Sequence, residues 1–481
     1  MTRRLPVTPS PAPLEGYATR FDDLFGARAQ REGFRRYLEG LLLPAERNKT
    51  LTALANTEPL PGAQRKEAQS LQWFLSESGW DAEEVNERRL ELLFAEAATA
   101  PEEDGVLVID EHGDRKWGTK TAHVGKQWLG NMGKTENGVV SVSSLLADEG
   151  VYYPLEVEPY TPAHHFRKGK SDPRFRTKLK IACQLVQRSV AEGVLFRAVV
   201  ADSFYGEDED FRAALSSLGV GYVLALKESH SWWHKEGTIG ALWEAALAAG
   251  WNNAGDPGEW RGVIRTFRDG HQETWWALEV RVGPYSPEKA RRALVVTTDP
   301  ERLPRLGTWY LTTNLPAPGF GEAKEEGQAL LAPASVGEVV RLYGLRMWVE
   351  QSYKQVKHAL GWSDYQVRSD LAIRRHWQLV FCAFSFCWWT CGEGLELLGA
   401  PPRIVLEDDA EVVPAATLGT QEGGKKERAT SSSSSSSSCT SIAVAEGAEA
   451  GKGVAGALRH ASAILEGIHR QGPARRVENI A

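Results

Sequence analysis

The stretch LFRAVVAD (residues 195–202) indicates the fold most directly, because it has the features of a short buried strand that ends in a carboxylate. An apolar run rich in β-branched residues is typical of a strand covered on both faces. The stretch GVLVID (105–110) has the same form and also ends in an aspartate. The two stretches therefore predict a sheet covered by helices, with Asp110 and Asp202 at the ends of strands.

The sequence around these two strands supplies the other elements of such a sheet. Residues 138–160 have the alternation of a hairpin around a DEG turn, and residues 175–193 have the apolar period of a helix. A second helix is expected over 208–219, followed by a strand over 220–227. The resulting order, β-β-β-α-β-α-β, predicts a mixed α/β sheet with flanking helices.

Changes in composition and in hydrophobic periodicity divide the chain into six segments. The spacing of Asp81 and Glu84 predicts a helix start in the first part of the chain. Eight consecutive serines and a low apolar content indicate disorder at the other end. We expect a loose N-terminus (1–15), an all-helical domain (16–97), the first part of the α/β core (98–228), a β-rich insertion (229–330), the rest of the core (331–395) and a disordered tail (396–481).

Composition excludes several classes of protein. The chain has 481 residues, 42% hydrophobic and 25% charged, which is typical of a globular protein of several domains. Residues 1–17 do not show the basic and apolar regions expected of a signal peptide. The longest apolar run, 379–391, is too short for a bilayer and predicts a buried helix. The five cysteines lack the spacing of a metal site and indicate a reducing cytoplasm.

The charge is unevenly distributed. A net charge of −7 argues against a nucleic-acid binder only if it is spread uniformly. The segment 164–180 carries seven Lys or Arg residues against one Asp. Such a segment is either a solvated charge run or a phosphate-binding surface. Its candidates for phosphate contact are Arg167, Lys168, Lys170, Arg174 and Arg176.

A helix predicted over YGLRMWVEQSYKQVK (343–357) has an unusual stripe. Tyr343, Arg346, Glu350 and Lys357 fall within an arc of about 60° on its surface. An ordinary surface helix scatters its charges, and a core helix makes its buried stripe apolar. The stripe is either a solvated face or a face directed at one charged partner.

Three carboxylates are candidates for a metal site. An Asp after a strand is commonly a turn or N-cap residue, and a Glu in a basic helix is commonly an ion-pair partner. If Asp110 and Asp202 end neighbouring strands, however, they converge and repel each other. Bound divalent cations would offset the electrostatic repulsion between the two carboxylates, and Glu350 would add a third oxygen ligand. Two such ions, about 4 Å apart, can activate a nucleophile and stabilise the leaving oxygen in phosphoryl transfer.

These elements and residues resemble the ribonuclease-H-like core of DDE transposases. The stretch 343–357 matches the Y-(2)-R-(3)-E-(6)-K signature of one group of bacterial insertion-sequence transposases. ADSFYG (201–206) and VLVIDEHG (106–113) are similar to that group's two aspartate motifs. The resemblance covers roughly residues 16–395 and implies an α/β (α+β) fold with a β insertion and an N-terminal DNA-binding domain.

The resemblance also implies roles for individual residues. Asp110, Asp202 and Glu350 would bind two Mg²⁺ ions, with Mn²⁺ as a substitute, while Tyr343, Arg346 and Lys357 would contact the DNA. Related transposases stack an aromatic side chain of the insertion on a flipped base, whereas most tryptophans serve in core packing. The stacking candidates are Trp260, Trp275, Trp276 and Trp309.

The implied function is that of a DNA transposase acting as a homo-oligomer on double-stranded element ends and target DNA. It needs no membrane and no nucleotide cofactor, in line with the absence of a G-x-x-x-x-G-K-[ST] phosphate loop from the sequence. Its expected place is the bacterial cytoplasm, at the nucleoid. Two alternatives stay open: a ribonuclease-H-like nuclease without strand transfer, and an inactive relative that only binds DNA.

Overall fold

The computed structural model describes residues 9–10, 12–43, 48–58, 65–233, 239–266, 271–282, 291–302, 307–319 and 331–398. The side chains of 348–358 and 390–398 lie outside this description, although their backbone belongs to helices. The segment predicted to be a disordered tail, 396–481, lies outside the described residues from 399 onward.

The chain begins with the predicted helices. They are α1 (Ala12–Ala18), the 3-10 helix η1 (Thr19–Leu24), α2 (Arg28–Leu42), α3 (Leu51–Leu54), α4 (Lys66–Ser76) and α5 (Ala82–Ala95). Asp81 caps α5 as predicted, and its carboxylate accepts a hydrogen bond from Glu83 N at 2.7 Å. The prediction of a loose segment over 1–15 is wrong from Ala12 onward, because Glu15 of α1 forms a 2.7 Å ion pair with the buried Arg35.

The centre of the molecule is a mixed sheet that contains the predicted β-β-β-α-β-α-β elements and adds a strand over 125–129 and a short helix over 203–206 that the sequence did not predict. Its strands and helices are β1 (Val106–Arg115), β2 (Gly125–Leu129), β3 (Lys134–Ala147), β4 (Tyr152–Tyr160), α6 (Lys178–Ala191), β5 (Ala198–Ala201), α7 (Ser203–Gly206), α8 (Glu209–Ser217) and β6 (Tyr222–Ala225). Strands β1, β5 and β6 are parallel, whereas β3 runs antiparallel to its neighbours β1, β2 and β4. The lateral order β4-β3-β1-β5-β6 is that of a ribonuclease-H-like fold.

The insertion continues this sheet instead of forming a separate one. Its elements are β7 (Ser231–Trp233), β8 (Ile239–Ala241), α9 (Leu242–Ala248), β9 (Arg261–Thr266), β10 (Gln272–Val282), β11 (Arg291–Thr297) and β12 (Trp309–Thr313). Strand β12 pairs antiparallel with β6, so the sheet runs on through β11, β10, β7 and β8. The insertion nevertheless has a second hydrophobic core of its own, which includes Leu242 and Trp260.

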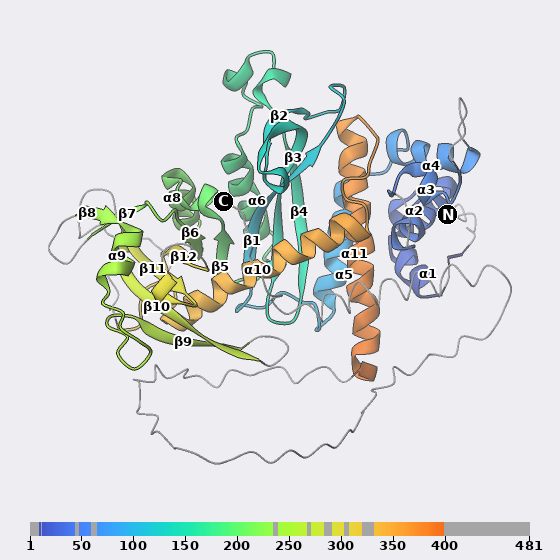
Figure 1. The fold of residues 1–481 in the computed structure, drawn as a ribbon. Helices are drawn as coiled ribbons and strands as arrows, with labels where there is room; N and C mark the ends of the chain where they lie inside the picture. Colours follow the sequence, from blue (N-terminus) through green and yellow to red (C-terminus); the bar gives the residue numbers. More distant parts are fainter. Residues whose placement is uncertain are drawn as a thin grey trace, which may run out of the picture.

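Two long helices complete the molecule, α10 (Val336–Ala359) and α11 (Asp370–Leu398). Figure 1 shows α10 running across the sheet from the insertion towards α11, which stands between the sheet and the N-terminal helices. Residues 379–388 of α11 are buried, as predicted for this apolar run. No helix within the described part of the chain has the length and apolar content needed to cross a membrane.

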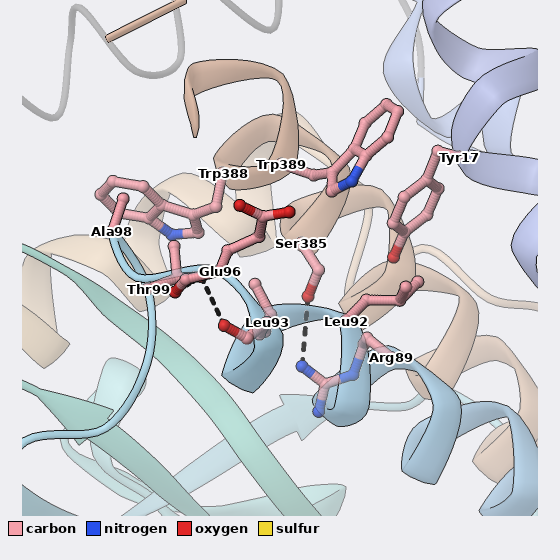
Figure 2. A pocket seen from close by; sticks show the side chains of 10 residues that line it. All are labelled: Tyr17, Arg89, Leu92, Leu93, Glu96, Ala98, Thr99, Ser385, Trp388 and Trp389. Carbon is pink, nitrogen blue, oxygen red and sulfur yellow. Dashed lines mark hydrogen bonds between the residues drawn. The ribbon is translucent and has the colours of Figure 1, made fainter. Parts of the chain in front are cut away.

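A buried arginine joins the N-terminal helices to the sheet. Arg89 of α5 is fully buried, and its guanidinium donates to the carbonyl oxygens of Pro154 and Leu155 on β4, both at 2.9 Å. It also donates to Asn86 Oδ1 at 2.6 Å and to Ser385 Oγ of α11 at 3.2 Å. Figure 2 shows the bond to Ser385 at the edge of a pocket between α5 and α11. One side chain thus holds α5, β4 and α11 together.

Candidate active site

The two predicted aspartates lie at the same level of the neighbouring parallel strands β1 and β5. Asp202 directly follows β5, but β1 runs on beside β3 as far as Arg115, so the prediction that its strand ends at Asp110 is wrong. The last paired residues of β1 and β5 are Val108 and Val200, and each aspartate follows two residues later. In a parallel pair, residues at the same level project to the same face of the sheet. Asp110 and Asp202 therefore lie side by side where the parallel pairing of β1 with β5 ends.

Asp202 has a structural role as well. It is the N-cap of α7, where its Oδ1 accepts a hydrogen bond from Phe204 N at 3.0 Å. A carboxylate has about four lone-pair sites, so capping occupies only part of its acceptor capacity. The short helix α7 packs so closely against β6 that a Cβ at Gly206 would come within 1.7 Å of the Ala225 carbonyl oxygen. The glycine of ADSFYG therefore permits the close approach that positions Asp202.

Helix α10 reaches the same edge of the sheet with its charged stripe. The Arg346 guanidinium lies 3.7 Å from Asp110 Oδ1, and the two side chains are 11% and 20% exposed. Residue 350 follows Arg346 by four positions and so lies on the same face of α10. The side chains of Glu350 and Lys357 lie outside the described part of the structure. At Arg346, however, the stripe faces the strand ends and not solvent.

Tyr343 occupies a different environment from the one that the resemblance implies. It is 5% exposed, and its ring packs against Trp309 of β12 at a centroid distance of 5.1 Å. Trp309 in turn contacts Trp275 of β10 at 4.4 Å. Arg265 of β9 lies 4.4 Å from the Trp275 ring centroid. Tyr343 thus belongs to an aromatic cluster that packs the insertion against α10, and its role at the DNA stays a prediction.

The stacking candidates differ in exposure. Trp260 is 2% exposed and Trp275 is 8% exposed, so both serve as core residues in this conformation. Trp276 and Trp309 are half-buried, and Trp276 packs on Trp251 at a centroid distance of 4.6 Å. Base stacking needs an accessible ring face. Trp276 and Trp309 therefore remain the better candidates for that role.

A polar cluster that the sequence did not reveal lies on the opposite face of the sheet. Glu111 follows Asp110 on β1 and so points towards α6, where Lys178 Nζ forms an ion pair with it at 2.5 Å. The Tyr205 hydroxyl donates to Glu111 Oε1 at 3.3 Å. Burial raises the pKa of Glu111, Lys178 opposes that rise, and the charge of Asp202 adds to it. The cluster ties the residue after Asp110 to the helix that begins at Asp202.

The basic segment divides into paired and exposed residues. Arg176 donates to Glu158 at 2.8 Å, so this cation of the basic segment has a structural ion-pair partner. Arg174 is 76% exposed and lies 3.2 Å from Asp172. Arg167, Lys168 and Lys170 are exposed. These four residues, Arg174 among them, are therefore accessible to a phosphate.

The carboxylates fit a divalent cation by their chemistry. Two carboxylates at the same level of adjacent strands supply the oxygen ligands that Mg²⁺ and Mn²⁺ prefer. Among the side chains that the structure describes, no group of three or more His, Cys, Asp or Glu residues is placed to hold a metal ion. A third ligand on this edge would have to come from α10, where Glu350 lies outside the described side chains.

The pocket in Figure 2 is separate from this edge. Its lining includes Tyr17, Arg89, Thr99 and Trp388, which come from the N-terminal helices, the segment after α5 and α11. None of the strand-end carboxylates contributes to it. The candidate active site therefore lies apart from this pocket, where β1 and β5 meet α10.

Comparisons with known proteins identify the class to which this fold and site belong. Residues 20–241 match a family model described as DDE superfamily endonuclease, and residues 176–386 match one described as transposase DDE domain. The chain belongs to the DDE transposases of insertion sequences. It is 31% identical over 368 residues to a probable transposase for insertion sequence element IS701 from Microchaete diplosiphon, covering 76% of this chain and 85% of that relative.

Proposed function

We propose that this protein cleaves the ends of an insertion sequence and joins the freed 3′-hydroxyl ends to target DNA by metal-dependent phosphoryl transfer. The observation that carries the proposal is the placement of Asp110 and Asp202 at the same level of adjacent parallel strands, with Arg346 beside Asp110. The membership of the DDE transposases gives the type of reaction. The Y-(2)-R-(3)-E-(6)-K group is the proposed subgroup.

The residues divide the work between binding and chemistry. Asp110, Asp202 and Glu350 would hold divalent cations, which supply Lewis-acid activation of the attacking oxygen and stabilise the leaving oxygen. Arg346, held at the edge by Asp110, is placed to contact a phosphodiester lying over the carboxylates. Lys357 and the exposed cations of 167–174 would contact the flanking phosphates, with no base specificity implied. Joining two ends in one event requires more than one subunit, so the active form is a homo-oligomer on DNA.

The decisive experiment replaces Asp202 by a residue that keeps its capping role. Asn is as good an N-cap as Asp, so Asp202→Asn removes the charge without removing the cap of α7. Mg²⁺-dependent cleavage of end-bearing DNA should fall by more than about 100-fold. Binding of the same DNA, measured by fluorescence anisotropy, should change by only a few fold.

A matched control is available six residues later. Asp208 caps α8 through a 2.7 Å bond from Phe211 N, and it lies outside the strand-end pair. Asp208→Asn should therefore retain cleavage. Full cleavage by Asp202→Asn would overturn the proposed site.

A second assay distinguishes the transposase from a nuclease. Supplied with a pre-cleaved end that carries a free 3′-hydroxyl, a transposase inserts it into a target plasmid, whereas a nuclease leaves it unjoined. Binding without either reaction in the wild-type protein would identify the inactive relative. The three carboxylates, retained together at 110, 202 and 350, favour the active enzyme.

A further inference from the structure

An exposed surface that combines aromatic and basic side chains lies on β2 and the segment before it. The 20 residues from Arg115 to Lys134 contain five Lys or Arg residues and no Asp or Glu. We define the hairpin surface as Arg115, Trp117, Lys120, Lys126 and Trp128, all exposed. Clustered cations with interleaved aromatic rings are typical of nucleic-acid binding.

The tryptophans of the hairpin surface are displayed to solvent. Trp117 is 85% exposed, and the Arg115 guanidinium lies 3.9 Å from its ring centroid. Trp128 is 56% exposed on the edge strand β2, where Lys126 and Trp128 alternate with the buried residues Gln127 and Leu129. A single exposed apolar residue is ordinary, but two indoles beside cations are an unusual use of surface. The stacking of Arg115 on Trp117 holds the ring in place and leaves most of it accessible.

The hairpin surface is anchored to the connection that follows α10. Ala122 N donates to the Arg368 oxygen at 2.8 Å, and Lys116 Nζ donates to the Ser363 oxygen at 3.2 Å. His123 Nε2 lies 2.7 Å from Asp370 Oδ1 at the start of α11. These contacts set the surface beyond the C-terminal end of α10, and Figure 1 shows β2 and the start of α11 at the same end of the molecule.

The geometry gives a path from the candidate active site to this surface. Helix α10 continues for 13 residues after Arg346, or roughly 20 Å at 1.5 Å per residue. That length corresponds to about six base pairs of DNA at about 3.4 Å each. DNA that leaves the strand-end carboxylates along α10 would therefore arrive at the hairpin surface.

We propose that the hairpin surface binds the DNA segment that leaves the catalytic edge along α10, with Trp117 stacking on an unpaired nucleotide and Lys120 and Lys126 contacting the backbone. The proposal rests on the proposed function for its DNA substrate. A protein partner fits the surface less well, because lysines are depleted at protein–protein interfaces. Phosphates, by contrast, complement a stretch with five cations and no acid.

The test measures binding of two DNA probes by the full-length protein and its variants. One probe is a blunt end-bearing duplex, and the other carries a single-stranded overhang beyond the end. Trp117→Ala should weaken binding of the overhang probe about tenfold and of the blunt probe less, because stacking acts on unpaired bases. Trp117→Phe should restore most of that loss. In Lys120→Gln/Lys126→Gln, the slope of log Kd against log salt should be smaller by about two.

Leu195 provides the control, because it lies outside the predicted N-terminal DNA-binding domain. It is 48% exposed in the segment before β5, so Leu195→Ala should bind both probes like the wild type. Equal binding of both probes by Trp117→Ala and the double lysine variant would overturn the proposal. A change confined to oligomeric state, measured by light scattering, would also overturn it and identify a self-association surface. Failure of the wild type to cleave element ends would instead refute the proposed function.

Discussion

The substitution Gly206→Ala tests whether the position of Asp202 depends on the close packing of α7 against β6. A Cβ at this glycine would lie 1.7 Å from the Ala225 carbonyl oxygen, whereas real contacts of this kind stay above 3.0 Å. Helix α7 and strand β6 would therefore have to separate by more than 1 Å. The Gly206 N–H donates to the main-chain carbonyl oxygen of Asp202 at 2.9 Å, so a displacement of Gly206 would also shift the backbone of Asp202.

The expected effect on catalysis is large relative to the change in the side chain. A misplacement of about 1 Å at a reacting centre can reduce a rate about 100-fold. Overpacking of this kind costs about 1–3 kcal/mol of folding free energy, so most of the protein should remain folded. We expect cleavage of an end-bearing plasmid to fall by one to two orders of magnitude, while DNA binding persists.

The measurements are the cleavage rate in Mg²⁺ and the melting temperature of the same preparation. Gly79→Ala serves as the control, because a Cβ at Gly79 meets no atom within 4 Å. The control should match the wild type in both measurements. A Gly206→Ala protein that cleaves within threefold of the wild type would refute the argument that close packing at Gly206 sets the position of Asp202.

Two further predictions concern the stability of the scaffold. Arg89→Met removes the donor to four buried acceptors, at about 1 kcal/mol each. Over about 350 described residues, that loss should lower the melting temperature by about 5 °C in calorimetry. Arg28→Met, at a 50% exposed side chain whose ion pair is with Glu32 one turn further on, should have little effect. Burial lowers the pKa of His376 to about 4 in the folded protein, whereas a histidine in the unfolded chain has a pKa near 6.5. Between pH 6.5 and 4, the unfolded chain therefore binds a proton at this residue that the folded protein does not bind. Stability should therefore fall as the pH drops from about 6.5 to 4, by an amount on the order of 3 kcal/mol, and urea titrations of His376→Gln should show a smaller fall; an unchanged pH dependence would contradict the assignment.

The local patterns of the sequence predicted most strands of the central sheet, because each contains an apolar run, but not their ends, since β1 continues past Asp110 to Arg115 beside β3. The runs ending in Asp110 and Asp202 became β1 and β5, and the hairpin over 138–160 became β3 and β4. Strand β2 was missed because GKQWL has one buried face and lies among glycines and lysines. This segment is a strand because it pairs with β3, and its composition does not indicate that pairing.

The features that the sequence did not predict depend on contacts between distant segments. The pairing of β12 with β6 joins residues nearly 90 positions apart, and no local pattern indicates that the insertion extends the core sheet. The sequence did not indicate the polar cluster around Glu111, because its partners Lys178 and Tyr205 come from other elements of the fold. Tyr343 was predicted to lie at the DNA, yet Trp309, brought by β12, covers its ring.

The pairing of β12 with β6 also bears on how the insertion can be altered. Strand β6 would be the last strand of the ribonuclease-H-like sheet, and β12 occupies its outer edge through Leu311, Thr312 and Thr313. An uncovered edge strand offers unpaired N–H and C=O groups to any other chain. A shortened protein that keeps the catalytic carboxylates but lacks this strand would therefore be prone to aggregate, so the insertion shields the catalytic sheet from other molecules.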